Sequence, residues 1–188
     1  MSDWQRDLTK SSQLFLAHVW PAIKAKCGGG QIKPVEILQD NEIARELDVL
    51  CGIDVWQTVD GEGARGIASR VQPTSRNWGT FTVRRRRFSG AKTEYEKRLE
   101  AIKSGGRFIY PFLTCQAYVD GDSLLGVGLA KTVNLYETIE RELTDGRVSR
   151  DRGGRAVWIN ETSNADFFCV RFDAVPGCWT YAAHQASA

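Results

Sequence analysis

Short strand-like runs separated by tight turns constrain the fold of this chain more than any other feature. Residues 53–59, 66–72 and 79–88 are rich in β-branched and aromatic side chains, as strands usually are. Asp60-Gly61, between the first two runs, is a strong signal for a hairpin turn. Three such runs joined by short connections predict an antiparallel meander of three strands.

Helix-like segments lie before and after this meander. Residues 40–51 open with capping residues and continue with an apolar stripe, which predicts a helix. Thr93 is placed to cap a second helix over residues 94–103, which has glutamates at its start and Lys103 near its end, the charge order that a helix dipole favours. We expect further strands at 107–119 and 123–132, a helix at 134–144, and closing strands at 156–160 and 166–174. The expected fold class is α/β (α+β), with a mixed central sheet flanked by helices.

The length of 188 residues suits a single domain. Residues 1–30 are expected to form an N-terminal helix and a glycine-rich linker at Gly28–Gly30. Pro21 should kink or end that helix, because proline has no N–H to donate. Residues 40–119 would then form the core, and residues 120–188 a C-terminal strand–helix–strand extension.

The composition narrows the class of protein. Five cysteines, an odd number without C-x-x-C spacing, and only two histidines argue against a Cys/His zinc site and indicate a reducing compartment. The polar N-terminus has no signal-peptide stretch. The longest apolar run, Leu14–Ile23, is too short to span a bilayer. We therefore expect a cytoplasmic protein that has no membrane partner.

Charge is unevenly distributed, although the net charge is only +2. Residues 40–62 hold seven acids and one arginine, whereas residues 65–107 hold twelve lysines and arginines and three glutamates. Such a basic segment suits the phosphate backbone of a nucleic acid. The candidate contacts are Arg84, Arg85, Arg86, Arg87 and Lys92, with Trp78, Phe88 and Tyr95 nearby for stacking on bases. Two alternatives stay open: arginines that solvate a sheet edge, and an acidic protein partner.

Strand alternation divides the four consecutive arginines between two faces. Arg84 should follow Thr80 and Thr82, and Arg86 should share that face. The alternation places Arg85 and Arg87 on the opposite face, with the apolar side chains.

The element order around Gly52-Ile53-Asp54 resembles the α-β-β-β-α-β core of the PD-(D/E)XK nuclease-like superfamily, which includes restriction endonucleases, junction resolvases and phage exonucleases. The resemblance covers about residues 40–119 and implies phosphodiester hydrolysis with Mg²⁺ or Mn²⁺. It implies that Asp54 and Glu46 hold the metal, that Arg70 contacts the scissile phosphate in place of the family's lysine, and that Gln72 orients water or substrate.

The second strand-like run, residues 66–72, departs from the family pattern. Ala68 stands two residues before Arg70, where the family has an acid. Arginine stays protonated, so it cannot serve as a base, and it repels a nearby metal ion. An ion pair of Asp54 with Arg70 is a purely structural alternative.

Three hypotheses about function therefore stay open. One is a nucleic-acid-binding protein, acting on DNA in preference to RNA, that is a Mg²⁺-dependent nuclease with a degenerate site. Another is a catalytically inactive protein of a phage or mobile element that binds nucleic acid or inhibits a protein. The third is an unrelated small-molecule enzyme.

Overall fold

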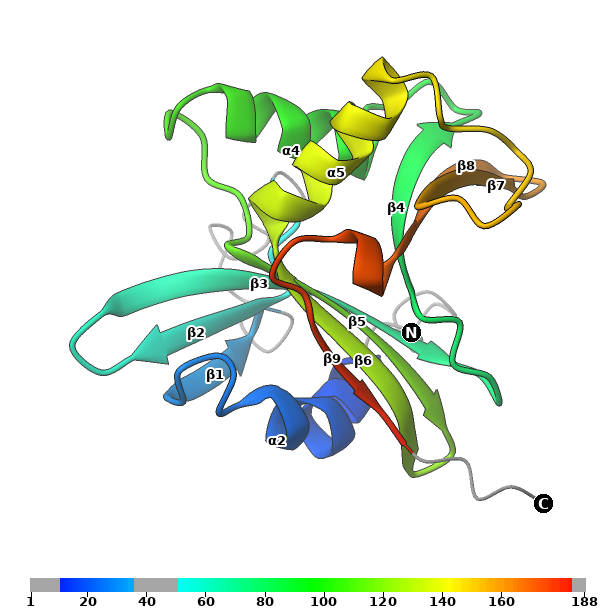
Figure 1. The fold of residues 1–188 in the computed structure, drawn as a ribbon. Coiled ribbons are helices and arrows are strands. Elements are labelled where there is room, and N and C mark those ends of the chain that lie inside the picture. The colour runs from blue at the N-terminus through cyan, green and yellow to red at the C-terminus, as the bar shows by residue number, and fades with distance from the viewer. Residues whose placement is uncertain (1–10, 36–50, 184–188) are drawn as a thin grey trace.

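Two β-sheets organise the part of the chain that the computed structural model describes, residues 11–35 and 51–183. Sheet A has the strand order β1-β2-β3-β5-β6-β9, and sheet B has the order β4-β8-β7 (Figure 1). Sheet A consists of β1 (Gln31–Pro34), β2 (Val55–Val59), β3 (Gly63–Pro73), β5 (Leu113–Asp120), β6 (Ser123–Lys131) and β9 (Trp179–Ala182). Sheet B consists of β4 (Thr80–Arg87), β7 (Val157–Glu161) and β8 (Ala165–Arg171).

Helices lie on both faces of sheet A. They are η1 (Phe15–Val19), α2 (Trp20–Ile23), α4 (Glu94–Lys103), α5 (Thr132–Thr144) and the short η4 (Phe172–Ala174). Figure 1 shows α2 below sheet A, and α4 and α5 above it, beside sheet B. β3 pairs antiparallel with β2 and parallel with β5, so the expected mixed sheet is confirmed. No helix in residues 11–35 or 51–183 is long and apolar enough to cross a membrane.

The expected meander of three adjacent strands is wrong. β2 and β3 form the predicted hairpin, but β4 leaves sheet A and pairs with β8. β3 ends at Pro73, and residues 74–79 form a longer connection than a tight hairpin turn, so β4 is free to diverge. The open edge of β3 pairs instead with β5, from Ile67–Leu113 to Pro73–Val119. The strand order therefore does not confirm a PD-(D/E)XK core.

Local signals predicted several element boundaries. Thr93 and Glu96 form the expected capping box at the start of α4, with Thr93 N donating to Glu96 Oε2 over 2.7 Å. The strand expected over 107–119 begins only at Leu113, after Pro111. The strand expected over 166–174 ends at Arg171 and passes into η4. β1 and β9 were not predicted, and the helix expected over 40–51 lies outside the described residues except for Cys51.

The N-terminal helix packs against sheet A. Phe15, Val19 and Ile23 are fully buried in one core with side chains of β3, β5 and β6. Helical winding changes from π to α at Trp20, next to Pro21, and continues to Ile23. A π segment at this place lets the helix accommodate a residue that lacks an N–H. Pro21 therefore neither ends the helix nor separates it from the sheet.

The glycine-rich segment is a fixed turn on β2, in contrast to the expected linker. Gln57, which is completely buried, donates from Nε2 to the carbonyl oxygens of Cys27, over 2.6 Å, and Gly29, over 2.7 Å. A Cβ at Gly30 would collide with the carbonyl oxygen of Thr58. The turn therefore requires glycine for close approach of two backbones.

The two faces of sheet B differ in character. Phe81, Val83 and Phe168 point toward α5 and form a second apolar core with Leu135 and Tyr136. The alternate positions of β4 and its partners carry mostly polar or aromatic side chains: Thr80, Thr82, Arg84, Phe167, Cys169, Trp158 and Asn160. We call this second surface the outer face of sheet B.

Replacing Phe15 with Ala should lower the free energy of unfolding by about 3–5 kcal/mol, because the change leaves a cavity between the N-terminal helix and sheet A. Chemical denaturation monitored by circular dichroism measures this loss. Gln13→Ala, an exposed change on the same helix, should shift stability by less than about 0.5 kcal/mol. Equal stabilities for the two variants would show that the N-terminal helix does not belong to the core.

Candidate nucleic-acid interface

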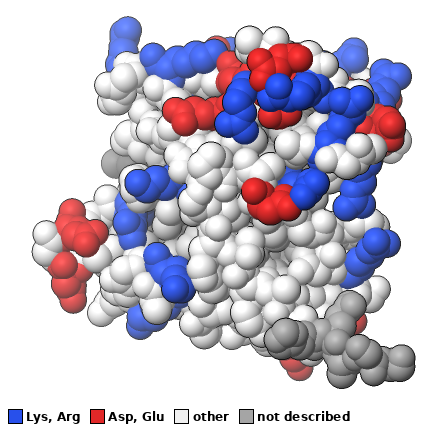
Figure 2. Space-filling model, in the orientation of Figure 1, with Lys and Arg blue, Asp and Glu red and all other residues white. Residues whose placement is uncertain are grey.

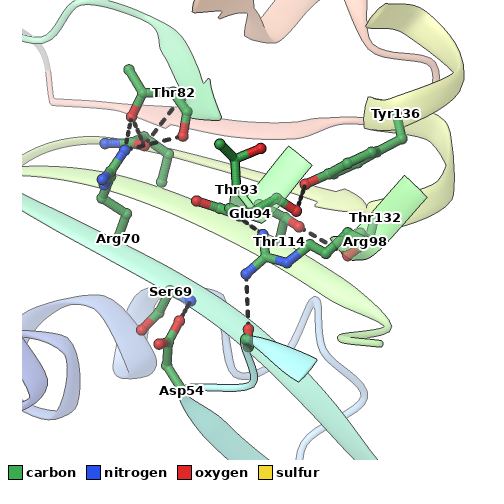
Figure 3. Close-up of polar contacts among 12 residues, drawn as sticks. Asp54, Ser69, Arg70, Thr82, Thr93, Glu94, Arg98, Thr114, Thr132 and Tyr136 are labelled. Atoms are coloured by element: carbon green, nitrogen blue, oxygen red, sulfur yellow. Dashed lines mark hydrogen bonds and ion pairs between the residues drawn. The ribbon is translucent and has the colours of Figure 1, made fainter. Parts of the chain in front are cut away.

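Asp54 lies at the start of the β2–β3 hairpin. Its backbone N–H donates to Ile67 O over 3.1 Å, and its Oδ2 accepts a hydrogen bond of 2.6 Å from the backbone N–H of Ser69 (Figure 3). Val55 pairs with Ile67, so continuing the register places Asp54 across from Ala68. The position where the family has a second acid is thus next to Asp54, and a methyl group occupies it.

The charge of Asp54 acts on the buried guanidinium of Arg98. Arg98 is 5% exposed, forms an ion pair with Glu94, and donates from Nη2 to Gly52 O over 2.8 Å (Figure 3). Burial lowers the pKa of Arg98, but Glu94, Tyr136 and Asp54 outweigh burial and hold that pKa above its ordinary value. Arg98 therefore stays charged.

Gly52 makes room for this contact. Its φ of +65° favours glycine, and a Cβ there would lie 2.8 Å from Nη2 of Arg98. The glycine of the Gly52-Ile53-Asp54 motif thus has a structural explanation in the contact between α4 and the segment before β2.

The donors described around Asp54 do not fit a divalent metal. Mg²⁺ takes oxygen ligands, usually one or two carboxylates together with phosphates and water. Ala68 supplies no oxygen, and the positive charge of Arg98 is coupled to Asp54. Within residues 11–35 and 51–183 no group of three or more His, Cys, Asp and Glu side chains is arranged to hold a metal ion. Glu46, the other expected ligand, lies outside the described residues.

Arg70 points from sheet A toward sheet B. Its Nη1 donates to Thr82 Oγ1 over 2.8 Å and to Thr82 O over 3.2 Å, and its guanidinium lies 5.4 Å from the ring centre of Phe167 (Figure 3). The sequence expectation that Arg70 and Gln72 share a face is confirmed, because both reach the side of sheet A next to sheet B. Arg98 is bound to Gly52 O, two residues before Asp54, whereas Arg70 is directed to the second sheet.

A polar seam joins the two sheets next to Arg70. Gln116 pairs in register with Arg70, is 2% exposed, and accepts a 3.0 Å hydrogen bond from the hydroxyl of Thr82. Its Nε2 has no hydrogen-bond partner among the described residues. Tyr118 donates to Thr80 O over 2.7 Å. These interactions fix the position of β4 against β3 and β5.

A cleft of about 320 Å³ opens where the seam meets the outer face of sheet B. Gln72, the third residue expected at the site, lines it from sheet A together with Tyr118. Sheet B and its neighbouring loops contribute Thr82, Cys169, Asn160, Trp78, Trp158 and Arg152. Arg76 lies 4.4 Å from the ring centre of Trp78, and Arg152 lies 5.0 Å from that of Trp158. Each tryptophan therefore has an arginine against its ring.

The four consecutive arginines divide differently from the expected alternation. A bulge shifts the register of β4 and β8 between Arg84 and Arg86. Arg84 and Arg87 consequently line the same cavity, of about 440 Å³, together with Phe88, Ser89, Ser163, Asn164 and Ala165. The prediction that Arg85 and Arg87 share a face is wrong, because a bulge interrupts the two-residue period.

Positive charge gathers at Arg84. Its guanidinium lies 5.5 Å from the ring centre of Phe167, the same ring that Arg70 covers. Burial, followed by the charges of Arg70 and Arg87, lowers the pKa of Arg84 below its ordinary value, and the opposing charge of Glu94 does not offset them. Its Nε is buried and has no hydrogen-bond partner among the described residues. The site thus holds mutually repelling cations.

Not all the expected phosphate-binding residues belong to this cluster. Arg85 forms an ion pair of 3.5 Å with Asp166, and Lys92 forms one of 2.7 Å with Glu100. Arg86 lies 5.2 Å from the ring centre of the exposed Phe88. Arg85 and Lys92 are therefore partly neutralised within the protein, in contrast to Arg84 and Arg87.

The described structure contains no ion pair between a carboxylate and any of five arginines: Arg70, Arg76, Arg84, Arg87 and Arg152. Figure 2 shows lysine and arginine side chains on the side of the molecule that carries sheet B and also on the opposite side, with acidic side chains among them and over the β2–β3 turn. We call these five residues, with Trp78, Trp158 and Phe167, the arginine–aromatic surface. Its chemistry suits a ligand that carries negative charge and flat rings.

Sequence reasoning missed Trp158, Arg152 and Phe167. They lie more than 60 residues from Trp78 in the chain, and only the β4–β8–β7 pairing brings them to the same surface. Trp158 and Asn160 alternate along β7, but such alternation occurs in many half-buried strands. Comparisons with protein-family models, curated proteins and solved structures gave no match to this chain.

Replacing Arg98 with Met should destabilise the protein by roughly 3–5 kcal/mol, because Glu94 then loses its buried partner and Gly52 O loses a donor. Combining it with Glu94→Gln should recover part of the loss. Urea denaturation measures both. Arg150→Met, which breaks an exposed pair with Glu161, should cost less than about 1 kcal/mol. A similar small loss for Arg98→Met would contradict its role as a buried tether.

Proposed function

We propose that this protein binds nucleic acid through the arginine–aromatic surface. The observation that carries the proposal is the set of five arginines, none of them paired with a carboxylate in the described structure, that lie along a cleft lined by two tryptophans and a second cavity lined by Arg84 and Arg87. Clustered cations of this kind repel one another, and a polyanion that binds among them relieves that repulsion.

Phosphodiesters match the chemistry of this surface. Guanidinium groups donate paired hydrogen bonds to phosphate oxygens, and aromatic rings stack on bases whatever the sequence. Gln72, Thr82 and Asn160 line the cleft and add groups that hydrogen-bond to sugars and base edges. DNA and RNA share the phosphate backbone, so this surface suits both. From the sequence we expect a preference for DNA.

The proposal is one of binding without metal-dependent hydrolysis. The described donor set does not fit Mg²⁺, and Asp54 is bound to Ser69 N and coupled to Arg98. The PD-(D/E)XK resemblance stays a hypothesis. On that hypothesis, Asp54 and Arg70 keep the order of the family motif while the acid at Ala68 has been lost, which agrees with a binding protein on a nuclease-like scaffold.

Replacing both Arg84 and Arg87 with Ala should weaken binding of a 20-nucleotide DNA or RNA about tenfold or more, since each substitution leaves one phosphate without its guanidinium. The slope of log affinity against log salt concentration should also become shallower. For a single strand the change should be about 0.7 for each phosphate contact that the variant has lost. Fluorescence anisotropy at several salt concentrations measures both quantities.

The control for this experiment is Arg147→Ala with Arg171→Ala, which removes two arginines that are paired with acids elsewhere on the surface. It should change affinity less than twofold. Equal losses for the two double variants would show that only net charge matters. Binding of polyglutamate as tight as that of nucleic acid would show an acidic protein partner instead.

Asp54→Asn should leave nucleic-acid affinity within about twofold of wild type, and EDTA should not weaken binding. Neither the wild type nor the variant should cleave DNA or RNA with Mg²⁺ or Mn²⁺. Gel assays with labelled substrates, with circular dichroism to verify folding, test this. Metal-dependent cleavage by the wild type that Asp54→Asn abolishes would establish the nuclease and overturn our assignment.

A further inference from the structure

We propose that the nucleic acid bound is single-stranded and lies along the outer face of sheet B, from the tryptophan-lined cleft to the cavity at Arg84 and Arg87. This inference rests on the proposed function and adds the strandedness of the ligand and its path. It follows from the order of side chains on that face and from the two cavities at its ends.

The two cavities lie in line along β4 and β8. Thr82 and Cys169 pair in register and line the first cavity, and Arg87 and Ala165 pair in register and line the second. Cys169 and Ala165 are four residues apart on β8, which corresponds to about 13 Å of strand. That distance is the length of about four stacked nucleotides.

Phe167 lies between the two cavities. It pairs in register with Arg84 on β4 and with Asn160 on β7. The guanidinium groups of Arg70 and Arg84 lie 5.4 and 5.5 Å from its ring centre. A strand that crosses this point meets two cations, one from each sheet, beside an aromatic ring. The middle of the path therefore offers both cations for phosphates and a stacking surface for a base.

The cleft accepts separate bases better than paired ones. Its volume of about 320 Å³ is at the lower end of the range for small-molecule pockets, and Trp78 beside it is 41% exposed. The bases of a duplex are stacked on one another and paired, so their flat faces are not free to stack on Trp78 or on the half-buried Trp158. An unpaired base presents both its face and its hydrogen-bonding edge.

A β-sheet surface with exposed aromatic and basic side chains is a general solution for single strands, because rings stack on bases and arginines follow the backbone. On the outer face of sheet B, the rings are Trp158 and Phe167, and the polar groups between them are Thr82 and Asn160. The opposite face is apolar and covered by α5, whereas the outer face carries the two cavities and the exposed Asn160.

The test measures affinity of the full-length protein for matched single-stranded and double-stranded oligonucleotides of the same sequence, as DNA and as RNA. Single strands should bind at least tenfold more tightly at the same salt concentration. Affinity should rise with length up to about four to six nucleotides and then increase only slightly.

Trp158→Ala and Trp78→Ala should each weaken single-strand binding by about five- to hundredfold, the loss of one stacked base. Trp158→Phe should restore most of the affinity, which separates stacking from a loss of folding. Phe108→Ala removes an exposed aromatic side chain from the loop after α4, away from sheet B, and should have no effect.

The outcomes separate the two proposals. Equal affinity for duplex and single strand, still reduced by loss of Arg84 and Arg87, would overturn the single-strand inference and leave the proposed function intact. Affinity that keeps rising beyond ten nucleotides in proportion to length, or that Trp158→Ala leaves unchanged, would overturn the path along sheet B. Failure to bind either form at low salt would overturn both proposals.

Discussion

Repulsion among close positive charges is the physical constraint on which the proposed binding of a polyanion depends. Arg70, Arg84 and Arg87 gather at one end of sheet B, where burial, and after it the charges of Arg70 and Arg87, lower the pKa of Arg84. Two neighbouring arginines differ from this cluster, because Arg98 pairs with Glu94 and Arg85 pairs with Asp166. Holding Arg70, Arg84 and Arg87 close together without carboxylate partners has a cost in stability. A bound polyanion would offset that cost, and this is the physical basis of the account.

The rest of the fold holds this cluster in place. Arg98 ties α4 to the segment before β2, and α4 in turn packs against β4. Gln116 and Tyr118 of β5 hold Thr82 and Thr80 of β4, so the two sheets meet at a fixed angle. Asp54, which in a nuclease would bind metal, serves the same scaffold by accepting from Ser69 N. The polar groups around Asp54 thus support a surface that lies on sheet B.

The sequence predicted features that depend on neighbouring residues. The capping box at Thr93, the Asp60-Gly61 hairpin and the shared face of Arg70 and Gln72 are local patterns, and the structure confirms them. Features that depend on distant pairing were not predictable: β4 pairs with β8 about 85 residues later, and only that pairing brings Trp158 to Trp78. The bulge between Arg84 and Arg86 interrupts the two-residue alternation of the strand. Four consecutive arginines give no indication of where such a bulge lies.

Hydrogen–deuterium exchange with and without a short single-stranded oligonucleotide tests the central claim most directly, because it locates the ligand without any substitution. We predict slower exchange in β4, β7 and β8 and in the loop that carries Trp78, with little change in β1 and the β2–β3 hairpin. Slower exchange around Asp54 and β2 without any change in sheet B would place the ligand at the nuclease-like motif and contradict the account.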